Sequence, residues 1–305
     1  MNQLLFHLCL LIITFFSVTY RENFFMIFKM SDTLLYQILL KEIPFSASLI
    51  LILFCHEMGH YIPSRFYGFR ATLPYFIPMP LGPVGTMGAV IKIKDPISDK
   101  LKLFDIGVGG PVVSLFLSMI CWIMGIYQSE LIEIEKFAKS GQYMLYFGDS
   151  LFTYWTAQWI HGPFDPSTSD ILIHPLAKAG WVGLLITAIN MLPFGQLDGG
   201  HVIYSLFGEN YRKWIYYLFL GFLVLSLVDF TWLLWGFMIR YIIKIEHPYV
   251  PDYSKPLNPK RKYLGYFMLF SLVITFVPNP ISIRSTEYQQ TTLLADIFHW
   301  IGSIF

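Results

Sequence analysis

The side chains best suited to chemistry lie together inside an apolar stretch of the chain. The segment LILFCHEMGHYIP places His56, Glu57 and His60 in an HExxH arrangement. On an α-helix, residues four apart lie on one face, so both imidazoles can bind one metal ion while Glu57 polarises a bound water. Imidazole nitrogens suit zinc, and an open coordination position makes such a site catalytic. Ionisable groups inside an apolar span are costly unless paired or hydrated, so we expect this cluster to be functional.

A second polar segment, NMLPFGQLDGGH from Asn190 to His201, supplies a carboxylate for the metal, Asp198. Proline and glycine interrupt the helix at Pro193, Gly195, Gly199 and Gly200. Irregular backbone at membrane depth lies against protein or a water-filled cavity, so we expect this segment to be a cavity wall. An ordinary helix-ending turn at the membrane interface is the alternative. His201 is either a partner that orients a ligand or a rival ligand.

Together the two motifs resemble the site-2 protease family of intramembrane zinc metalloproteases, whose members pair an HExxH helix with a later LDG segment. The matching residues are His56, Glu57, His60, Asn190, Pro193, Leu197, Asp198 and Gly199. GVGGPVVS, with Gly110 and Ser114, looks like the family's GxxxN/S/G element, and the similarity runs from about Pro44 to Pro280. The resemblance implies one zinc ion, bound by His56, His60 and Asp198, with Glu57 as the general base.

The chain departs from the family pattern in two places. Met191 follows Asn190 where many members carry proline. This departure leaves two interpretations of Asn190, which is a candidate catalytic residue. Its side-chain amide could donate to the substrate backbone or oxyanion, or it could form an interhelical hydrogen bond. No segment is long enough for the PDZ domain that some members insert, which removes one route of substrate regulation.

The composition predicts that lipid surrounds these motifs. Of 305 residues, 55% are hydrophobic and only 13% are charged, which is more apolar surface than a soluble fold can bury. Aromatic residues make up 18%, which suits rings at membrane interfaces. The net charge of +1 gives no support for a nucleic-acid partner. The three cysteines lie in apolar runs and predict no disulfide framework.

Seven stretches approach the length needed to cross a bilayer. They are Leu4–Tyr20, Phe45–Phe66, Ile106–Tyr127, Leu176–Phe194, Trp214–Val228, Thr231–Ile245 and Tyr263–Val277. We predict an all-α polytopic membrane protein with about six to seven transmembrane helices, in which the first stretch resembles a signal anchor as much as a bundle helix. The expected organisation is an N-terminal membrane segment and linker (residues 1–44), a metalloprotease membrane core (45–280) and a C-terminal interfacial tail (281–305).

The connections between these stretches are expected to differ in charge and structure. Basic residues gather after the second stretch and before the last, which predicts that both connections are cytoplasmic. Residues Gln128–Pro175 carry two lysines and six acidic residues, so we expect a surface loop with one short helix on the opposite side. Thr291–Phe305 has apolar residues at helical spacing, which is typical of a segment in the interface plane.

A small β-hairpin or loop insertion is predicted after the HExxH helix. Arg70–Lys102 is rich in proline and glycine and includes AVIKIK, Ala89–Lys94, which alternates as a half-buried strand does. An open strand edge could pair with an extended substrate, because a helical substrate hides its peptide bonds. The candidate substrate-binding residues are Gly85, Gly88, Ile91 and Ile93.

These features favour a zinc-dependent intramembrane endopeptidase that hydrolyses peptide bonds in or near transmembrane segments. The resemblance implies a single-pass membrane protein as the substrate and partner, besides the lipid bilayer, and we expect a multi-pass protein of the cell membrane. A multi-pass transporter or channel with a structural metal site is the alternative. It would spread ionisable residues along a path, whereas here they concentrate in two motifs.

Overall fold

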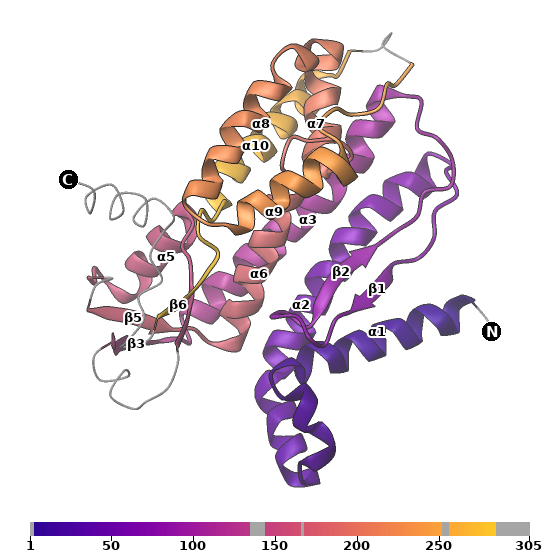
Figure 1. Ribbon diagram of the computed structural model, residues 1–305. Coiled ribbons are helices and arrows are strands. Elements are labelled where there is room, and N and C mark those ends of the chain that lie inside the picture. Colours follow the sequence, from indigo (N-terminus) through magenta and orange to yellow (C-terminus); the bar gives the residue numbers. More distant parts are fainter. Residues whose placement is uncertain (1–2, 135–143, 166–167, 252–255, 285–305) are drawn as a thin grey trace. The chain divides into compact units, whose positions relative to one another are not determined.

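The computed structural model describes residues 3–134, 144–165, 168–251 and 256–284. These residues are mostly helical, with small two-stranded sheets between helices. The chain divides into two compact units, Met1–Ser129 with Ile173–Thr187, and Glu130–Leu172 with Ala188–Phe305. Figure 1 shows the order of the elements along the chain. The predicted predominance of helices is confirmed, and the described residues contain two small sheets besides the predicted hairpin.

Long helices form the first unit. They are α1 (Gln3–Thr19), α2 (Asp32–Phe66), α3 (Lys100–Ile126) and most of α6 (Pro175–Asn190), with a short 3₁₀ segment, η1 (Arg21–Lys29), after α1. Side chains define two of the helix starts, because Ser31 Oγ accepts the N–H of Leu34 and Asp99 Oδ1 accepts the N–H of Leu101. The α2 helix therefore begins well before the apolar stretch predicted from Phe45.

Two glycines let α2 and α3 pack backbone against backbone. A Cβ atom on Gly59 would lie 2.4 Å from the carbonyl oxygen of Gly109, and one on Gly109 would lie 2.1 Å from that of Gly59. Any larger residue would push the helices apart, because real Cβ contacts are never this short. Gly59 lies within the HExxH motif, so this contact fixes the metal-binding turn of α2 against α3.

The predicted insertion after the HExxH helix is a β-hairpin, and its strand bounds differ from those expected. Strands β1 (Tyr75–Pro78) and β2 (Thr86–Val90) pair antiparallel, with a register shift between Phe76 and Pro78. The strand predicted at Ala89–Lys94 therefore starts earlier and ends at Val90. Beyond β2 the chain stays extended beside residues 70–72, with a bridge between Ala71 and Ile93. The alternation of AVIKIK continues through both pieces, so the pattern alone does not show where β2 ends.

The N-terminal helix covers the first strand of this hairpin. The Ser17 hydroxyl donates to the Gly85 carbonyl (2.6 Å), and His7 Nδ1 lies 3.0 Å from the Pro74 carbonyl oxygen. Gly85 has φ +84°, and a Cβ there would lie 2.6 Å from the Val18 backbone. Gly85 thus allows both the backbone conformation of the hairpin turn and the close contact of that turn with α1.

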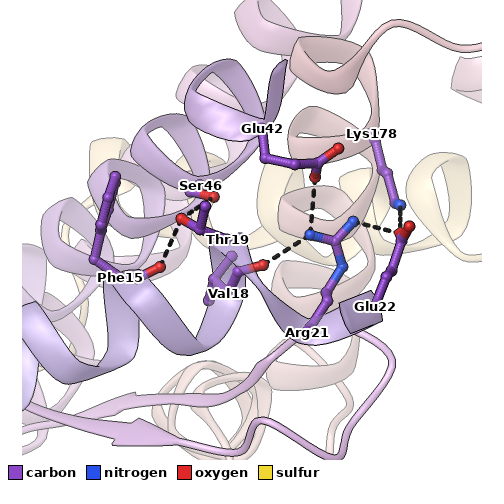
Figure 2. Close-up of polar contacts among 8 residues, drawn as sticks. All are labelled: Phe15, Val18, Thr19, Arg21, Glu22, Glu42, Ser46 and Lys178. Atoms are coloured by element: carbon purple, nitrogen blue, oxygen red, sulfur yellow. Dashed lines mark hydrogen bonds and ion pairs between the residues drawn. The ribbon is translucent and has the colours of Figure 1, made fainter. Parts of the chain in front are cut away.

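A buried ion-pair cluster ties η1 to α2 and α6 (Figure 2). The Arg21 side chain is only 2% exposed and donates to Glu42 Oε2 (3.0 Å) and Glu22 Oε1 (2.8 Å). Lys178 Nζ donates to the same Glu22 oxygen (3.1 Å), and the Arg21 guanidinium stacks 4.3 Å from the Phe45 ring centre. Two cations face two carboxylates, so no unpaired charge is buried. The cluster holds the bend of 91° between α1 and η1.

Shorter helices make up most of the second unit. They are α7 (Asp198–Phe207), α8 (Ile215–Val224), α9 (Thr231–Met238) and α10 (Pro259–Thr275), joined by the short helical turns η2 (Gly208–Lys213), η3 (Leu225–Leu227) and η4 (Ile239–Ile243). The apolar run from Trp214 to Ile245 breaks where Asp229 predicts a turn, and Asp229 Oδ1 accepts the N–H of Thr231 (2.7 Å) at the start of α9.

The described residues of Gln128–Pro175 contain more secondary structure than the predicted surface loop. It contains the expected short helix, α5 (Leu151–His161), and three strands, β3 (Glu130–Glu133), β4 (Met144–Phe147) and β5 (Ser169–Leu172). β3 pairs with β5, and β4 pairs with β6 (Ile281–Arg284). The strands have four residues each and partners far along the chain, which is why no local pattern predicts them. The predicted interfacial segment Thr291–Phe305 lies outside the described residues.

Two helices of the described residues, α2 and α3, are long and apolar enough to cross a membrane. The bent pair α1 and η1 adds a third if it is one span, and Ile215–Leu227 and Thr231–Ile243 are shorter apolar helices. Every apolar stretch named from the sequence contains a helix. The count of six to seven spans stays a prediction, because α6 and α10 have only 16 and 17 residues.

Candidate metal centre

His56 and His60 lie one turn apart on α2 and point their Nε2 atoms at each other. The two nitrogens are 3.1 Å apart, and the side chains are 4% and 8% exposed. Two nitrogens bound to one zinc at about 2.0–2.1 Å with a tetrahedral angle are roughly 3.3 Å apart. The observed spacing therefore fits a shared zinc ion.

The backbone of α3 fixes the tautomer of His60. Its Nδ1 lies 2.6 Å from the Ile106 carbonyl oxygen, which can only accept a hydrogen bond. The proton of the neutral ring is therefore on Nδ1, and Nε2 keeps its lone pair for a metal. The ring lies directly against Gly110, where a Cβ would be 2.2 Å from His60 Nε2. The imidazole fits against α3 because Gly110 has no side chain.

A chain of hydroxyl groups supports His56 in the same way. Its Nδ1 lies 2.9 Å from Ser114 Oγ, which is 3.3 Å from the Pro111 carbonyl and 2.9 Å from Thr187 Oγ1. Ser114 can accept the Nδ1 proton while donating its own to Pro111, which leaves Nε2 of His56 available to a metal. The sequence pattern indicates Ser114 through the GxxxS spacing but gives no signal for Thr187 or Ile106.

Glu57 is 8% exposed and is tied to the hairpin. The backbone N–H of Ile91 donates to Glu57 Oε2 at 2.8 Å. This bond holds the carboxylate in one orientation directly beside the His56 position on α2. Of the predicted substrate-binding residues, the structure thus brings Ile91 to the predicted base, while Gly85 packs on α1 instead.

Asn190 and Asp198 flank one tight turn in the second unit. Asn190 ends α6 and Asp198 begins α7. Between them Gly195 has φ +51° and donates its N–H to the Ile245 carbonyl (3.0 Å). Gly199, directly after Asp198, lies against the Met191 carbonyl. The predicted break in the helix is observed, and the cavity wall stays a prediction. A carboxylate in the first turn of α7 is favoured by the helix dipole.

One turn beyond Asp198, His201 forms a pair with the buried His247. His201 Nδ1 is 2.7 Å from His247 Nε2, and His247 Nδ1 is 2.6 Å from the Pro248 carbonyl oxygen. Since the carbonyl only accepts, His247 carries its proton on Nδ1, and His201 must donate through Nδ1. The accepting nitrogen of His201 is then Nε2. The Tyr204 ring stacks on His247 at 4.5 Å, and no local pattern of the sequence indicates this partner.

The burial of His247 predicts a dependence of stability on pH. Burial lowers the pKa of His247 below its ordinary value, so the folded protein does not take the proton that the unfolded chain takes up near pH 6.5. The free energy of unfolding should fall as the pH drops below that value. His247→Gln can still accept from His201 but cannot be protonated, so its Tm should fall less than the wild-type Tm between about pH 7.5 and about pH 5.5. An equal fall in both proteins would contradict this assignment.

Comparisons with known proteins identify the family to which this site belongs. The family model described as peptidase family M50 matches residues 44–226, a range that contains both the HExxH and the LDG motifs. The chain belongs to peptidase family M50. Membership confirms the resemblance to the site-2 protease family that the two motifs predict.

Several curated proteins are similar to the chain. The chloroplastic proteins of Arabidopsis thaliana named probable zinc metalloproteases EGY2 and EGY1 are 27% and 30% identical to it, over 84% and 80% of this chain. The chloroplastic EGY1 of Oryza sativa subsp. japonica is 30% identical over 55% of this chain. The alignments cover 45%, 44% and 28% of those proteins, so the chain spans less than half the length of these relatives.

Proposed function

We propose that the chain is a zinc-dependent intramembrane endopeptidase that hydrolyses peptide bonds in or near transmembrane segments of membrane proteins. The observation that carries the proposal is the buried pair of Nε2 atoms on α2, each imidazole held at Nδ1 by a group of α3. The helix that carries this pair is long and apolar enough to cross a membrane. Membership of peptidase family M50 supports the reaction class.

In this proposal one zinc ion is bound by His56, His60 and Asp198. Two neutral imidazoles and one carboxylate are a donor set that zinc accepts, and a fourth position is left open for water or substrate. Bound zinc lowers the pKa of its water to about 7 and polarises the scissile carbonyl. The relatives named as probable zinc metalloproteases support the choice of metal.

Glu57 acts as the general base. Its carboxylate takes a proton from the attacking water and passes it to the leaving amine, as a positioned carboxylate can. The N–H of Ile91 orients the carboxylate through Oε2. Asn190 is proposed to donate its side-chain amide to the substrate backbone or to the developing oxyanion.

The substrate is proposed to bind as an added strand along residues 91–93. The N–H of Thr72 donates to the Lys92 carbonyl (3.1 Å) and the N–H of Lys94 donates to the Arg70 carbonyl (2.8 Å). Ile93 is therefore a non-hydrogen-bonded partner of Ala71, and its own N–H and carbonyl point away from residues 70–72. By the two-residue period, they point to the same side as the Ile91 N–H that meets Glu57. Gly88, with φ +99° and open space around it, allows close approach of a second backbone.

The strand proposal predicts a specific effect of proline at position 93. Ile93→Pro removes an N–H that makes no bond to residues 70–72, so the hairpin should persist while the hydrogen bond to substrate is lost. We expect kcat/KM for a membrane substrate to fall by roughly tenfold, the value of one or more lost hydrogen bonds. Ile93→Ala keeps the N–H and is the matched control. Equal cleavage by the proline and alanine variants would remove the strand proposal. Ile91→Pro is a poorer test, because it also frees Glu57.

The substrate class, the location and the number of spans are part of the same proposal. We propose a single-pass membrane protein as the substrate, and a core of six to seven transmembrane helices that includes α6 and α10. The relatives are named chloroplastic, which describes those proteins. For this chain we propose a multi-pass protein of the cell membrane, and the location of a tagged full-length chain in its own cells tests that part.

Cleavage by the purified protein tests the proposed function. In nanodiscs with a tagged single-pass substrate, the wild type should release a shorter fragment, a zinc chelator should stop the release, and added zinc should restore it. A transporter or channel with a structural metal site would bind zinc without cutting the substrate. Zinc binding without any fragment, for several unrelated single-pass substrates, would favour that alternative.

A further inference from the structure

The helix α5 carries a row of apolar side chains left uncovered by the described residues. Leu151, Trp155 and Trp159 are 46%, 60% and 83% exposed, and their spacing of four places them on one helix face. The opposite face is buried through Thr153 and Ala157. The helix therefore has one face packed against protein and one aromatic face directed outwards.

The α5 helix lacks the charged side chains that are typical of a helix exposed to water. The sequence of α5, LFTYWTAQWIH, contains no lysine, arginine, aspartate or glutamate. Its start is well defined, because Ser150 Oγ accepts the N–H of Thr153 in a capping box. A fixed helix that presents two tryptophans and a leucine to its surroundings marks an interaction site.

The segment that carries α5 is joined at both ends to apolar helices by short connections. α3, one of the two helices long and apolar enough to cross a membrane, ends at Ile126, and β3 begins only four residues later at Glu130. At the other end of the segment, β5 ends at Leu172 and α6 begins at Pro175. If α3 crosses the bilayer, the segment that carries α5 begins at the membrane surface. Tryptophan and tyrosine are the residues enriched at that surface.

We propose that α5 lies in the membrane interface, on the side where α3 ends, with Leu151, Trp155 and Trp159 in the boundary between headgroups and acyl chains. Around it in the chain, Gln128–Pro175 carries two lysines against six acidic residues, among them Glu130, Glu133, Asp165 and Asp170. This excess of negative charge gives no attraction to anionic headgroups. The partner is therefore a zwitterionic phospholipid surface that the aromatic rings enter without help from basic residues.

Tryptophan quenching in nanodiscs tests the contact without any measurement of activity. The full chain is placed in phosphatidylcholine with or without bromine on the acyl chains, near the headgroup or near the bilayer centre. The double variant Trp155→Phe/Trp159→Phe, compared with the wild type, isolates the emission of these two among the eight tryptophans. We expect that emission to be quenched more strongly by the shallow bromines than by the deep ones, with no requirement for anionic lipid.

Trp181→Phe is the matched control, since Trp181 is only 2% exposed and its removal should leave the lipid-quenched emission unchanged. Quenching of the Trp155 and Trp159 emission by aqueous acrylamide, with none by brominated lipid, would show that the face is in water. Quenching by neither would show that protein, such as a second copy of the chain, covers it. Either result overturns the proposal, and neither depends on the proposed peptidase activity.

Discussion

Replacement of Glu57 by glutamine should abolish peptide-bond cleavage while the bound zinc is retained. Glutamine has nearly the same shape, and its amide oxygen can still accept the Ile91 N–H that now meets Glu57 Oε2 at 2.8 Å. It cannot accept a proton from water. General-base catalysis contributes about 10²–10⁴-fold to rates, so kcat should fall by at least that factor. The measurement pairs kcat with the zinc content of the same preparation.

Glu130→Gln is the matched control for this substitution. Glu130 is exposed on β3 and has no part in the metal centre. Its variant should keep both zinc and cleavage. A Glu57→Gln protein that cleaves within a few-fold of the wild type would exclude Glu57 as the base. If Glu57→Gln loses its zinc, the side chain is needed for metal binding rather than for proton transfer alone.

Replacement of Gly110, which lies on α3, by alanine should displace His60 and weaken zinc binding. The added methyl group would lie 2.2 Å from His60 Nε2 and 2.6 Å from its Cε1, so either the imidazole moves or α3 withdraws. Both responses displace the nitrogen proposed to bind zinc. A displacement of about 1 Å at a reacting centre can cost about 10²-fold in rate. We therefore expect a lower zinc affinity, measured by competition with a chelator, and a loss of cleavage of that order.

Gly221→Ala separates this effect from the general consequences of adding a methyl group to a helix. Gly221 lies in α8, and a Cβ there meets no atom within 4 Å. The substitution should be neutral or slightly stabilising, because alanine favours helix more than glycine does. Wild-type zinc affinity and cleavage in Gly110→Ala would show that the space beside His60 is not limiting.

The residues proposed to bind the metal were easier to predict from the sequence than the groups that orient them. The spacing of His56 and His60 alone places both on one helix face, and hydropathy locates that helix in an apolar stretch. The Ile106 carbonyl, which holds His60, and the Thr187 hydroxyl, which contacts Ser114 beside His56, come from other helices. Their backbone and short polar side chains have no spacing pattern, so only the packing of α2, α3 and α6 indicates them.

The fold shows the same division between local and distant information. Each long apolar run predicts a helix because its pattern is local, and the break at Asp229 follows from one polar residue in such a run. The pairing of β4 with β6 joins residues 144–147 to residues 281–284, and strands this short have too little alternation to predict it. The end of β2 at Val90 was missed for a different reason, since alternation continues past it as far as Lys94.

The central claim is that two imidazoles of α2 and the first carboxylate of α7 bind one zinc ion. X-ray absorption at the zinc edge, together with metal content, tests it on the purified full chain. We expect one zinc per chain with two imidazole nitrogens and carboxylate oxygen at about 2.0–2.2 Å. Asp198→Ala should lose the metal or that oxygen, whereas Asp229→Ala, which alters a turn far along the chain, should keep both. An unchanged zinc content and spectrum in Asp198→Ala would contradict the account.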